Sequence, residues 1–224
     1  MPIPAGSRYV AMGSSFAAGP GLPSRVPGSP RQAGRSTGNY AHLVARELGL
    51  DLHDVTFSGA TTSDLPGPSA AGLAAQLDAV TPETSLVTIT AGGNDVSFLP
   101  RLTLASLPWP LRALPPVKAR VESLGQTRAT DQRFEQLERN LAAIAARLAA
   151  TTQAAASTAG WTYVAASAAS ADHHAWSAEP WTRRFHLSLR GGAPYHPNAA
   201  GMAAVARLVV AALRPGTSTD PEVH

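Results

Sequence analysis

The chain has 224 residues, a length that suits one domain with a sizeable core, and we expect residues 1–224 to form a single domain. Its formal net charge is +3 and its pI is near 9.8. No block of consecutive basic residues occurs and aromatic residues do not alternate with arginine, so no nucleic-acid partner is expected. Cysteine is absent, which excludes disulfides, zinc–thiolate sites and a cysteine nucleophile.

The N-terminal residues indicate in which cellular compartment the protein is expected. They contain no apolar stretch typical of a signal peptide, because the first strand is expected to begin by Arg8. No apolar run is long enough to span a bilayer, so no stable membrane insertion is expected. These features predict a cytoplasmic protein, although a secreted protein whose leader has been removed would share them. The sequence does not indicate the oligomeric state.

Strand and helix signals alternate along the chain. Short apolar runs predict strands over residues 8–12, 52–57, 85–90 and 161–166. Apolar spacing and capping residues predict helices over residues 39–48, 70–80, 134–148 and 197–213. This alternation is typical of an α/β fold with a parallel sheet that is covered on both faces.

Residues 99–126 are rich in proline and leucine. Five prolines in this stretch prevent one long helix, but its apolar residues still need to be covered. We therefore expect part of the stretch to wall a ligand site, with Trp109 or a neighbouring leucine close to that site. A purely structural insertion is the plainer interpretation.

Four polar or glycine positions lie at expected strand ends or helix starts. Ser15, Gly59 and Asn94 each follow a strand, and His196 precedes the last helix. Ligands bind at the carboxyl ends of the strands in parallel sheets, so these positions belong to one candidate site. Taken singly, each has a plainer interpretation: a cap for Ser15, a turn glycine, an Asx-turn for Asn94 and a surface cap for His196. Asp95 is interpreted as a structural partner of its turn.

Together these positions supply the parts of a serine ester hydrolase. Ser15 would attack a carbonyl carbon, and His196 would take its proton and later protonate the leaving alcohol. The backbone N–H groups of Ser15 and Gly59 and the side-chain amide of Asn94 would hold the oxyanion.

The motifs resemble those of the SGNH hydrolases, also called the GDSL esterase/lipase family. The resemblance runs from Tyr9 to Leu213 and is strongest in Val-Ala-Met-Gly-Ser-Ser-Phe-Ala-Ala-Gly, Gly-Gly-Asn-Asp and His-Pro-Asn-Ala-Ala-Gly. The family's Ser, Gly, Asn and His match Ser15, Gly59, Asn94 and His196. The resemblance implies a flavodoxin-like three-layer α/β/α sandwich and a serine acyl-enzyme mechanism, with no metal and no organic cofactor.

Two positions depart from the family's pattern. Its first block usually reads Gly-Asp-Ser, and here Ser14 stands in place of the aspartate. Its last block usually reads Asp-x-x-His, and the aspartate position holds Ala193. We expect the backbone carbonyl of Ala193 to orient His196 and give a Ser–His dyad. Asp172 is a second candidate for the acid, and a degenerate site is a third alternative.

The sequence therefore predicts a carboxylic ester hydrolase of the esterase or lipase type that acts on small-molecule acyl esters. A thioesterase, a carbohydrate O-acetylesterase and an acyltransferase would share the same site. The alternative from another class is a binding protein that keeps the fold with a weak or degenerate site.

Overall fold

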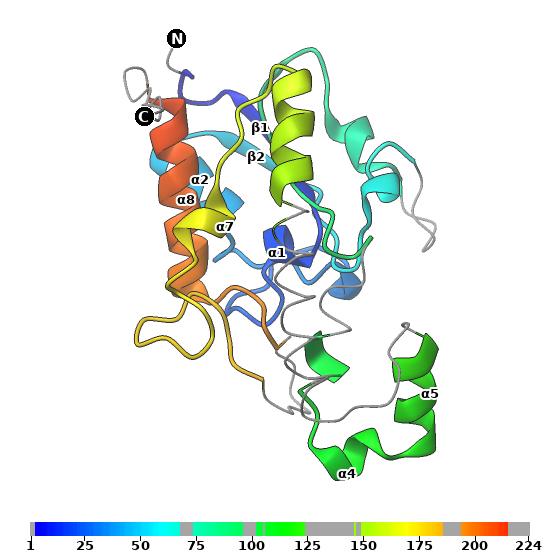
Figure 1. Ribbon diagram of the computed structural model, residues 1–224. Helices are drawn as coiled ribbons and strands as arrows, with labels where there is room; N and C mark the ends of the chain where they lie inside the picture. The colour runs from blue at the N-terminus through cyan, green and yellow to red at the C-terminus, as the bar shows by residue number, and fades with distance from the viewer. Residues whose placement is uncertain are drawn as a thin grey trace.

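A computed structural model describes residues 3–67, 74–95, 102–104, 106–123, 146, 149–185 and 194–214. Its centre is a parallel sheet of three strands in the order β2-β1-β3 (Figure 1). These strands are β1 (Arg8–Gly13), β2 (Asp51–Asp54) and β3 (Thr84–Thr90). They confirm three of the predicted strands and the α/β class with a central parallel sheet. Tyr9 pairs with Leu52 on one side and with Leu86 on the other, so β1 is the middle strand.

The fourth predicted strand is wrong. Residues 161–165 carry no strand, and the short helix α7 (Ala166–Ala169) follows them directly. Val164 packs against the hydrophobic core, which explains the apolar pattern. Its carbonyl, however, accepts a turn hydrogen bond from the N–H of Ala166 at 2.8 Å, so the backbone bends instead of pairing with the sheet. Apolar alternation reports burial and does not by itself report a strand partner.

Two helices close one face of the sheet. They are α2 (Tyr40–Leu48) and α8 (Ala199–Leu213), and both were predicted within one or two residues. Each begins at an asparagine: Asn39 accepts from the N–H of His42 at 3.0 Å, and Asn198 accepts from the N–H of Gly201 at 2.9 Å.

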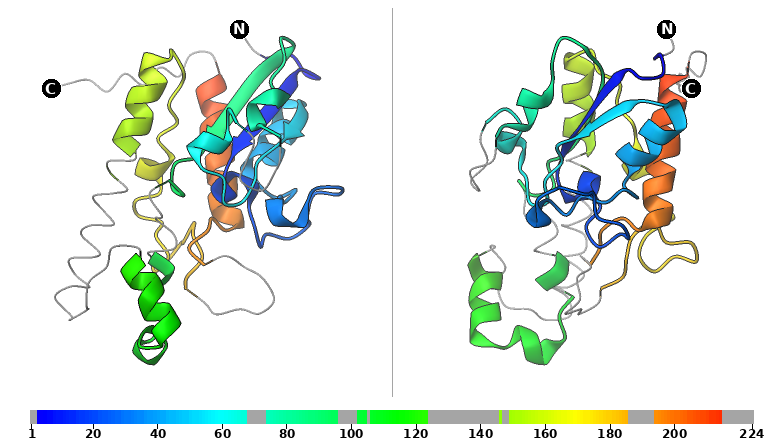
Figure 2. Two further views of the ribbon diagram at one scale, coloured as in Figure 1. Left: turned by 90° about the vertical axis from the view of Figure 1, so that its right-hand side faces the viewer. Right: turned by 180° about the vertical axis from the view of Figure 1, so that it is seen from behind.

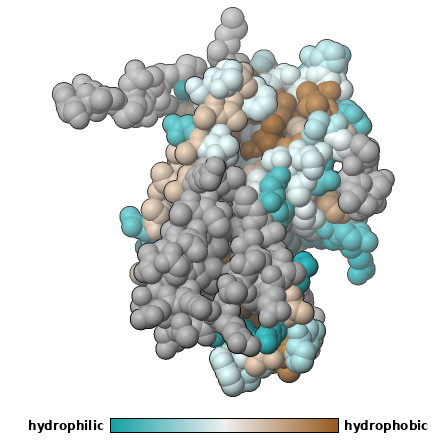
Figure 3. Space-filling view, turned by 45° about the vertical axis from the view of Figure 1, so that its right-hand side comes forward, coloured by the Kyte–Doolittle hydropathy of each residue, from teal (hydrophilic) through white to brown (hydrophobic). Residues whose placement is uncertain are grey.

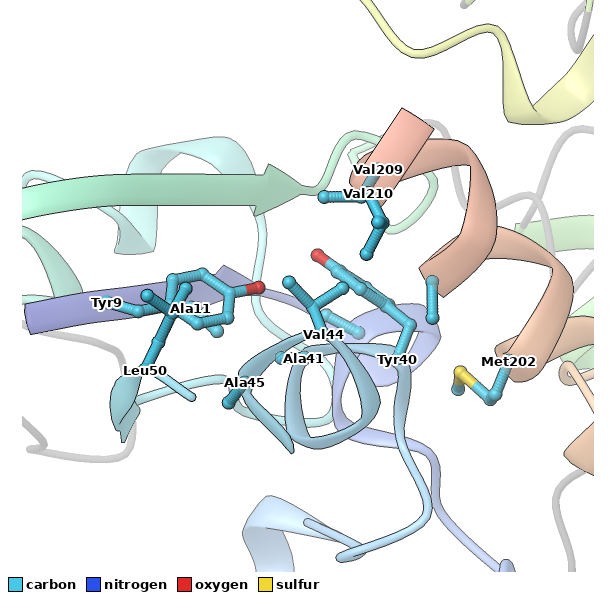
Figure 4. Close-up of a cluster of buried hydrophobic side chains, with 12 residues drawn as sticks. Tyr9, Ala11, Tyr40, Ala41, Val44, Ala45, Leu50, Met202, Val209 and Val210 are labelled. Carbon is cyan, nitrogen blue, oxygen red and sulfur yellow. The ribbon is translucent and has the colours of Figure 1, made fainter. Parts of the chain in front are cut away.

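The core lies between β1 and these two helices. Tyr9 and Ala11 of β1 point toward the side chains of Tyr40 and Val44 from α2 and of Met202 from α8 (Figure 4). Val10 and Met12, which alternate with them along β1, are buried as well. Because successive side chains of a strand point to opposite faces, β1 is covered on both faces.

Further helices of three to nine residues have bounds that the structure describes. They are α1 (Ser15–Ala18), η1 (Arg31–Ala33), η2 (Thr62–Asp64), η3 (Gln76–Ala79), α4 (Trp109–Arg112) and α5 (Pro115–Ser123). Of the helix predicted over 70–80, residues 70–73 lie outside the described residues, and the described part contains η3. Most of the helix predicted over 134–148 also lies outside, while residues 149–158 are helical. No helix among the described residues is long and apolar enough to cross a membrane.

In its described part, residues 102–104 and 106–123, the proline-rich stretch forms short helices and no single long helix, which agrees with the prediction that its prolines prevent one. Pro108 directly precedes α4, and Pro115 begins α5. Both helices project from the lower end of the molecule in the two views of Figure 2. Figure 3 shows apolar side chains in the upper half of one face, whereas the projecting end at the bottom mixes apolar and polar side chains.

A buried carboxylate holds the end of β2 against the start of α2. The Asp54 side chain is 5% exposed and accepts from Asn39 Nδ2 at 2.9 Å, from Thr56 Oγ1 at 2.7 Å and from the Thr56 N–H at 3.0 Å. His42 Nε2 lies 3.5 Å from the same carboxylate. Burial alone would raise the pKa of Asp54, but its contacts with His42, Thr56 and Asn39 outweigh burial and lower that pKa below its ordinary value.

Replacing this carboxylate is expected to destabilise the fold. Asp54→Ala should lower the free energy of unfolding by about 3 kcal/mol, because it leaves buried donors without an acceptor. Chemical denaturation measures this change. Asp51→Ala, at an exposed position of the same strand, is the matched control and should change stability by no more than about 0.5 kcal/mol. Equal effects of the two substitutions would contradict a structural role for Asp54.

Candidate active site

A sharp turn joins β1 to α1 at the carboxyl end of the sheet. Gly13 has φ +133°, and a Cβ atom there would lie 2.2 Å from the carbonyl oxygen of Thr90, so only glycine fits. The N–H of Ser14 donates to that same Thr90 oxygen at 2.9 Å. Ser15 is then the first residue of α1 and is 6% exposed. The close approach of β3 therefore fixes the point at which the chain turns into Ser15.

The hydroxyl and the backbone N–H of Ser15 are not used by the local fold. Its N–H is one of the first in α1, where backbone donors have no partner within the helix. In the part of the chain that the structure describes, its hydroxyl takes part in no hydrogen bond. The neighbouring Ser14 makes no side-chain capping bond either. Both the hydroxyl and the N–H of Ser15 are therefore available to a ligand.

A short antiparallel pairing holds His196 near this turn. The N–H of Arg183 donates to the His196 carbonyl at 2.9 Å, and the N–H of Asn198 donates to the Trp181 carbonyl at 2.8 Å. The ring of Phe16, in α1, lies against the His196 ring with centroids 5.3 Å apart. The structure thus brings the first and last predicted motifs together (Figure 1).

The His196 ring is oriented by a backbone carbonyl. Its Nδ1 lies 3.0 Å from the carbonyl oxygen of Pro194, which can only accept, so Nδ1 carries the proton and Nε2 of the neutral ring is free to accept one. Ala193, the predicted partner, lies outside the described residues. No carboxylate among the described residues pairs with His196, and the alternative acid Asp172 is exposed.

The environment of His196 favours the neutral ring. The residue is 7% exposed, and burial lowers the pKa of His196 below its ordinary value of 6.5. The hydrogen bond to Pro194 opposes this shift, and the positive charge of Arg183 adds to it. At neutral pH the ring is therefore able to accept a proton.

Gly59 and Asn94 lie on two loops that are bonded to each other. Gly59 has φ +90°, and a Cβ there would meet nothing within 4 Å, so the space above this backbone is open. Asn94 Nδ2 donates to the Ala60 carbonyl at 2.8 Å, next to Gly59. The Asp95 carboxylate accepts from the Thr62 hydroxyl at 2.6 Å and from the Thr62 N–H at 3.1 Å. Asp95 thus makes structural contacts, but with the loop that follows Gly59 and not with its own turn as predicted, and it ties the two loops together.

Tyr195 is a site residue that the motifs did not indicate. It has φ +59°, a left-handed conformation that is costly for a residue with a Cβ. Its hydroxyl lies 2.6 Å from the Ser106 hydroxyl, and its ring lies near Phe185 and Trp176. The residue before His196 is therefore held by the proline-rich stretch. No periodicity or motif could have indicated this contact between distant segments.

The proline-rich stretch reaches the loop before His196 through Ser106, whose hydroxyl contacts Tyr195. Trp109, three residues later, is 73% exposed on α4. That part of this stretch, with Trp109 or a neighbouring leucine, walls the acyl side of the site stays a prediction.

Comparison with known proteins identifies the family. A model of the GDSL-like lipase/acylhydrolase family matches residues 11–204. The chain belongs to this family. The fold is accordingly the flavodoxin-like three-layer α/β/α sandwich that the resemblance predicted.

Individual members of the family are similar to this chain. A protein named Lipase 2 from Streptomyces coelicolor is 45% identical over 91 residues, which are 40% of this chain and 30% of that protein, so the match spans less than a third of the relative. The crystal structure of an extracellular lipase from Streptomyces rimosus covers 92% of this chain and 99% of its own, with 25% identity and a TM-score of 0.69. A phospholipase A1 from Streptomyces albidoflavus has the same fold, with a TM-score of 0.67 at 23% identity over 92% of this chain and 99% of its own.

The environment of His196 leads to a measurable pKa. In an NMR titration, assigned with a His196→Gln variant, the His196 ring is expected to titrate below 6.5, because burial disfavours the charged form. The unfolded chain then binds the proton more tightly, so protonation of this ring lowers stability as the pH falls through 6.5. A His196 pKa at or above 6.5 would contradict the described environment.

Proposed function

We propose that this GDSL-family protein hydrolyses carboxylic esters through an acyl-enzyme formed on Ser15, with His196 as the general base. The observation that carries the proposal is the contact between the loop that holds His196 and α1, the helix that begins with Ser15 at the carboxyl end of β1. Phe16 and His196 are in ring contact, the Ser15 hydroxyl has no partner among the described residues, and Nε2 of His196 is left free to accept a proton.

The reaction has two balanced halves. Ser15 Oγ attacks the ester carbonyl carbon while Nε2 of His196 takes the hydroxyl proton. The tetrahedral intermediate collapses as His196 returns that proton to the leaving alcohol, and the acyl group stays on Ser15. His196 then deprotonates a water molecule that attacks the acyl carbon, and the proton passes back to Ser15 Oγ as the acid leaves.

Three donors would stabilise the oxyanion in both halves. They are the backbone N–H groups of Ser15 and Gly59 and the side-chain amide of Asn94. Asn94 uses one amide hydrogen to reach the Ala60 carbonyl, which fixes the amide and leaves its second hydrogen for the substrate. Donors that are held in place before the reaction lower the barrier because they need no reorganisation.

The proposed catalytic pair works without a carboxylate. A backbone carbonyl orients the ring: Pro194 supplies it in the structure, and Ala193 was the residue predicted from the motif. A neutral acceptor stabilises the imidazolium less than a carboxylate does, because charge-assisted hydrogen bonds are roughly twice as strong. The enzyme is therefore expected to be slower than one with a full triad, yet active.

Small acyl esters are the proposed substrates. The relatives are named as lipases and a phospholipase A1, which favours an acyl ester over other substrates.

Secretion is the proposed cellular location. The Streptomyces rimosus relative is named as an extracellular lipase, which favours secretion over the cytoplasmic location expected from the N-terminal sequence.

A binding protein with a weak site is the second candidate function, because His196 lacks a carboxylate partner among the described residues.

Ser15 is expected to be essential for hydrolysis. Ser15→Ala should lower kcat for p-nitrophenyl acetate and butyrate on the order of 10⁴-fold or more, with unchanged circular dichroism, because no other group replaces the nucleophile. The adjacent Ser14→Ala is the matched control and should keep most of the activity, since Ser14 makes no capping bond. Near-normal turnover by folded Ser15→Ala, or loss of turnover only in Ser14→Ala, would contradict the assignment.

Asn94 is expected to act in the transition state. Asn94→Ala should lower kcat by roughly 10²–10³-fold with little change in KM, because the oxyanion exists only in the transition state. Thr62→Val serves as the control, since it removes the hydroxyl bond to Asp95 that helps tie the same two loops, while the Thr62 N–H bond and the Asn94 amide remain. If KM rises while kcat holds, or if both variants lose the same activity, Asn94 is not an oxyanion donor.

A further inference from the structure

The side chain of Gln76 forms two hydrogen bonds with the backbone of Gly13. Its Oε1 accepts from the Gly13 N–H at 2.7 Å, and its Nε2 donates to the Gly13 carbonyl at 3.1 Å. The glutamine is 6% exposed, and both bonds are buried. One side-chain amide thus holds both polar groups of the last residue of β1.

This position on β1 has an unusual need for such a partner. The Gly13 carbonyl also accepts from the Phe57 N–H at 2.9 Å, beyond the end of β2 at Asp54. The Gly13 N–H donates to Gln76 instead of to a neighbouring strand. Without the glutamine, this N–H would be a buried donor with no acceptor, which is costly. The amide therefore supplies the acceptor that the Gly13 N–H lacks on the β2 side, while Gly13 stays paired with Thr90 of β3 on the other side.

Gln76 lies on a segment that belongs to none of the four sequence motifs, and other hydrogen bonds hold that segment in place. It is the first residue of η3, which is fixed by the Leu77 N–H donating to the Leu65 carbonyl at 2.9 Å. At the other end of η3, Arg8 Nη2 donates to the Ala79 carbonyl at 3.0 Å. These bonds hold the glutamine side chain against the end of β1.

We propose that Gln76 is the positioning residue of the nucleophile turn. The proposal rests on the function proposed for Ser15. By fixing both polar groups of Gly13, Gln76 sets the direction in which the chain enters Ser14 and Ser15. It thereby sets the place of the Ser15 hydroxyl and of the Ser15 N–H relative to His196 and the substrate carbonyl. The side chain of Ser14 makes no capping bond and does not hold the start of α1.

The first test removes both hydrogen bonds while keeping the size of the side chain. Gln76→Leu should lower kcat for p-nitrophenyl acetate by roughly 10- to 100-fold with KM within about 2-fold, because small displacements of a reacting group cost rate rather than binding. Tyr9→Phe is the matched control, since it removes one hydrogen bond of a buried side chain, to Thr88 at 2.8 Å, elsewhere on β1. Its kcat should stay within about 2-fold of the wild type.

The second test restores the bonds by pH. In Gln76→Glu, the protonated carboxyl group accepts from the Gly13 N–H and donates to the Gly13 carbonyl, as the amide does, whereas the ionised group lacks the donor. The ratio of kcat in Gln76→Glu to kcat in the wild type should therefore rise as the pH is lowered. Taking this ratio removes the titration of His196, which is common to both proteins. Gln76→Leu should show a constant ratio over the same range.

The outcomes separate this proposal from the one on which it rests. If wild-type protein hydrolyses esters and loses that activity in Ser15→Ala, the proposed function holds. Gln76→Leu with wild-type kcat then overturns the role of Gln76 alone. If Gln76→Leu fails to fold, the pH dependence of Gln76→Glu decides, and a constant ratio overturns the proposal. A wild type that hydrolyses no ester overturns both.

Discussion

The turn after Gly13 is the constraint on which the site depends. β1 is the middle strand, so its end can be held from both sides: Thr90 of β3 receives the Ser14 N–H, while Phe57 and Gln76 bond Gly13 itself. The contact with Thr90 is so close that a Cβ atom does not fit. A chain held this tightly has one direction in which to continue, and that direction places a serine at the start of α1. The close approach of Thr90 and the buried hydrogen bonds from Gln76 act on the same residue, Gly13.

The second half of the site is assembled from distant segments. His196 lies in a short loop before α8, and that loop is paired with the backbone around Arg183 and held through Tyr195 by Ser106. The capping asparagine of α8 also donates to the Pro180 carbonyl at 2.6 Å, which ties the same two segments together. The ring contact with Phe16 then joins this loop to the nucleophile turn. Catalysis by a serine–histidine pair needs both parts to be rigid, because neither residue is oriented by a carboxylate among the described residues.

The sequence predicted those parts of the fold that depend on local patterns. The β-branched run of β3, the caps at Asn39 and Asn198 and the parallel α/β class follow from spacing and composition, and the motif order indicated the family. Contacts between distant segments leave no such pattern. The two hydrogen bonds from Gln76 to Gly13 and the hydroxyl pair of Tyr195 and Ser106 therefore could not be predicted. The apolar run ending at Ala166 predicted a strand, but Val164 packs partly buried against the core without pairing. A backbone partner for His196 was expected because no acidic residue stands at the motif position, but which carbonyl fills that role depends on the local turn.

Covalent labelling tests the central claim most directly. A fluorophosphonate reacts only with a serine that a base activates and that oxyanion donors surround, so it reports nucleophile, base and donors in one measurement. Intact-mass and peptide analysis of the labelled protein should show one adduct per chain, on the peptide that carries Ser15, and the adduct should be absent from Ser15→Ala. A folded protein that acquires no adduct, or one that carries it on another serine, would contradict the assignment of this site as a serine hydrolase centre.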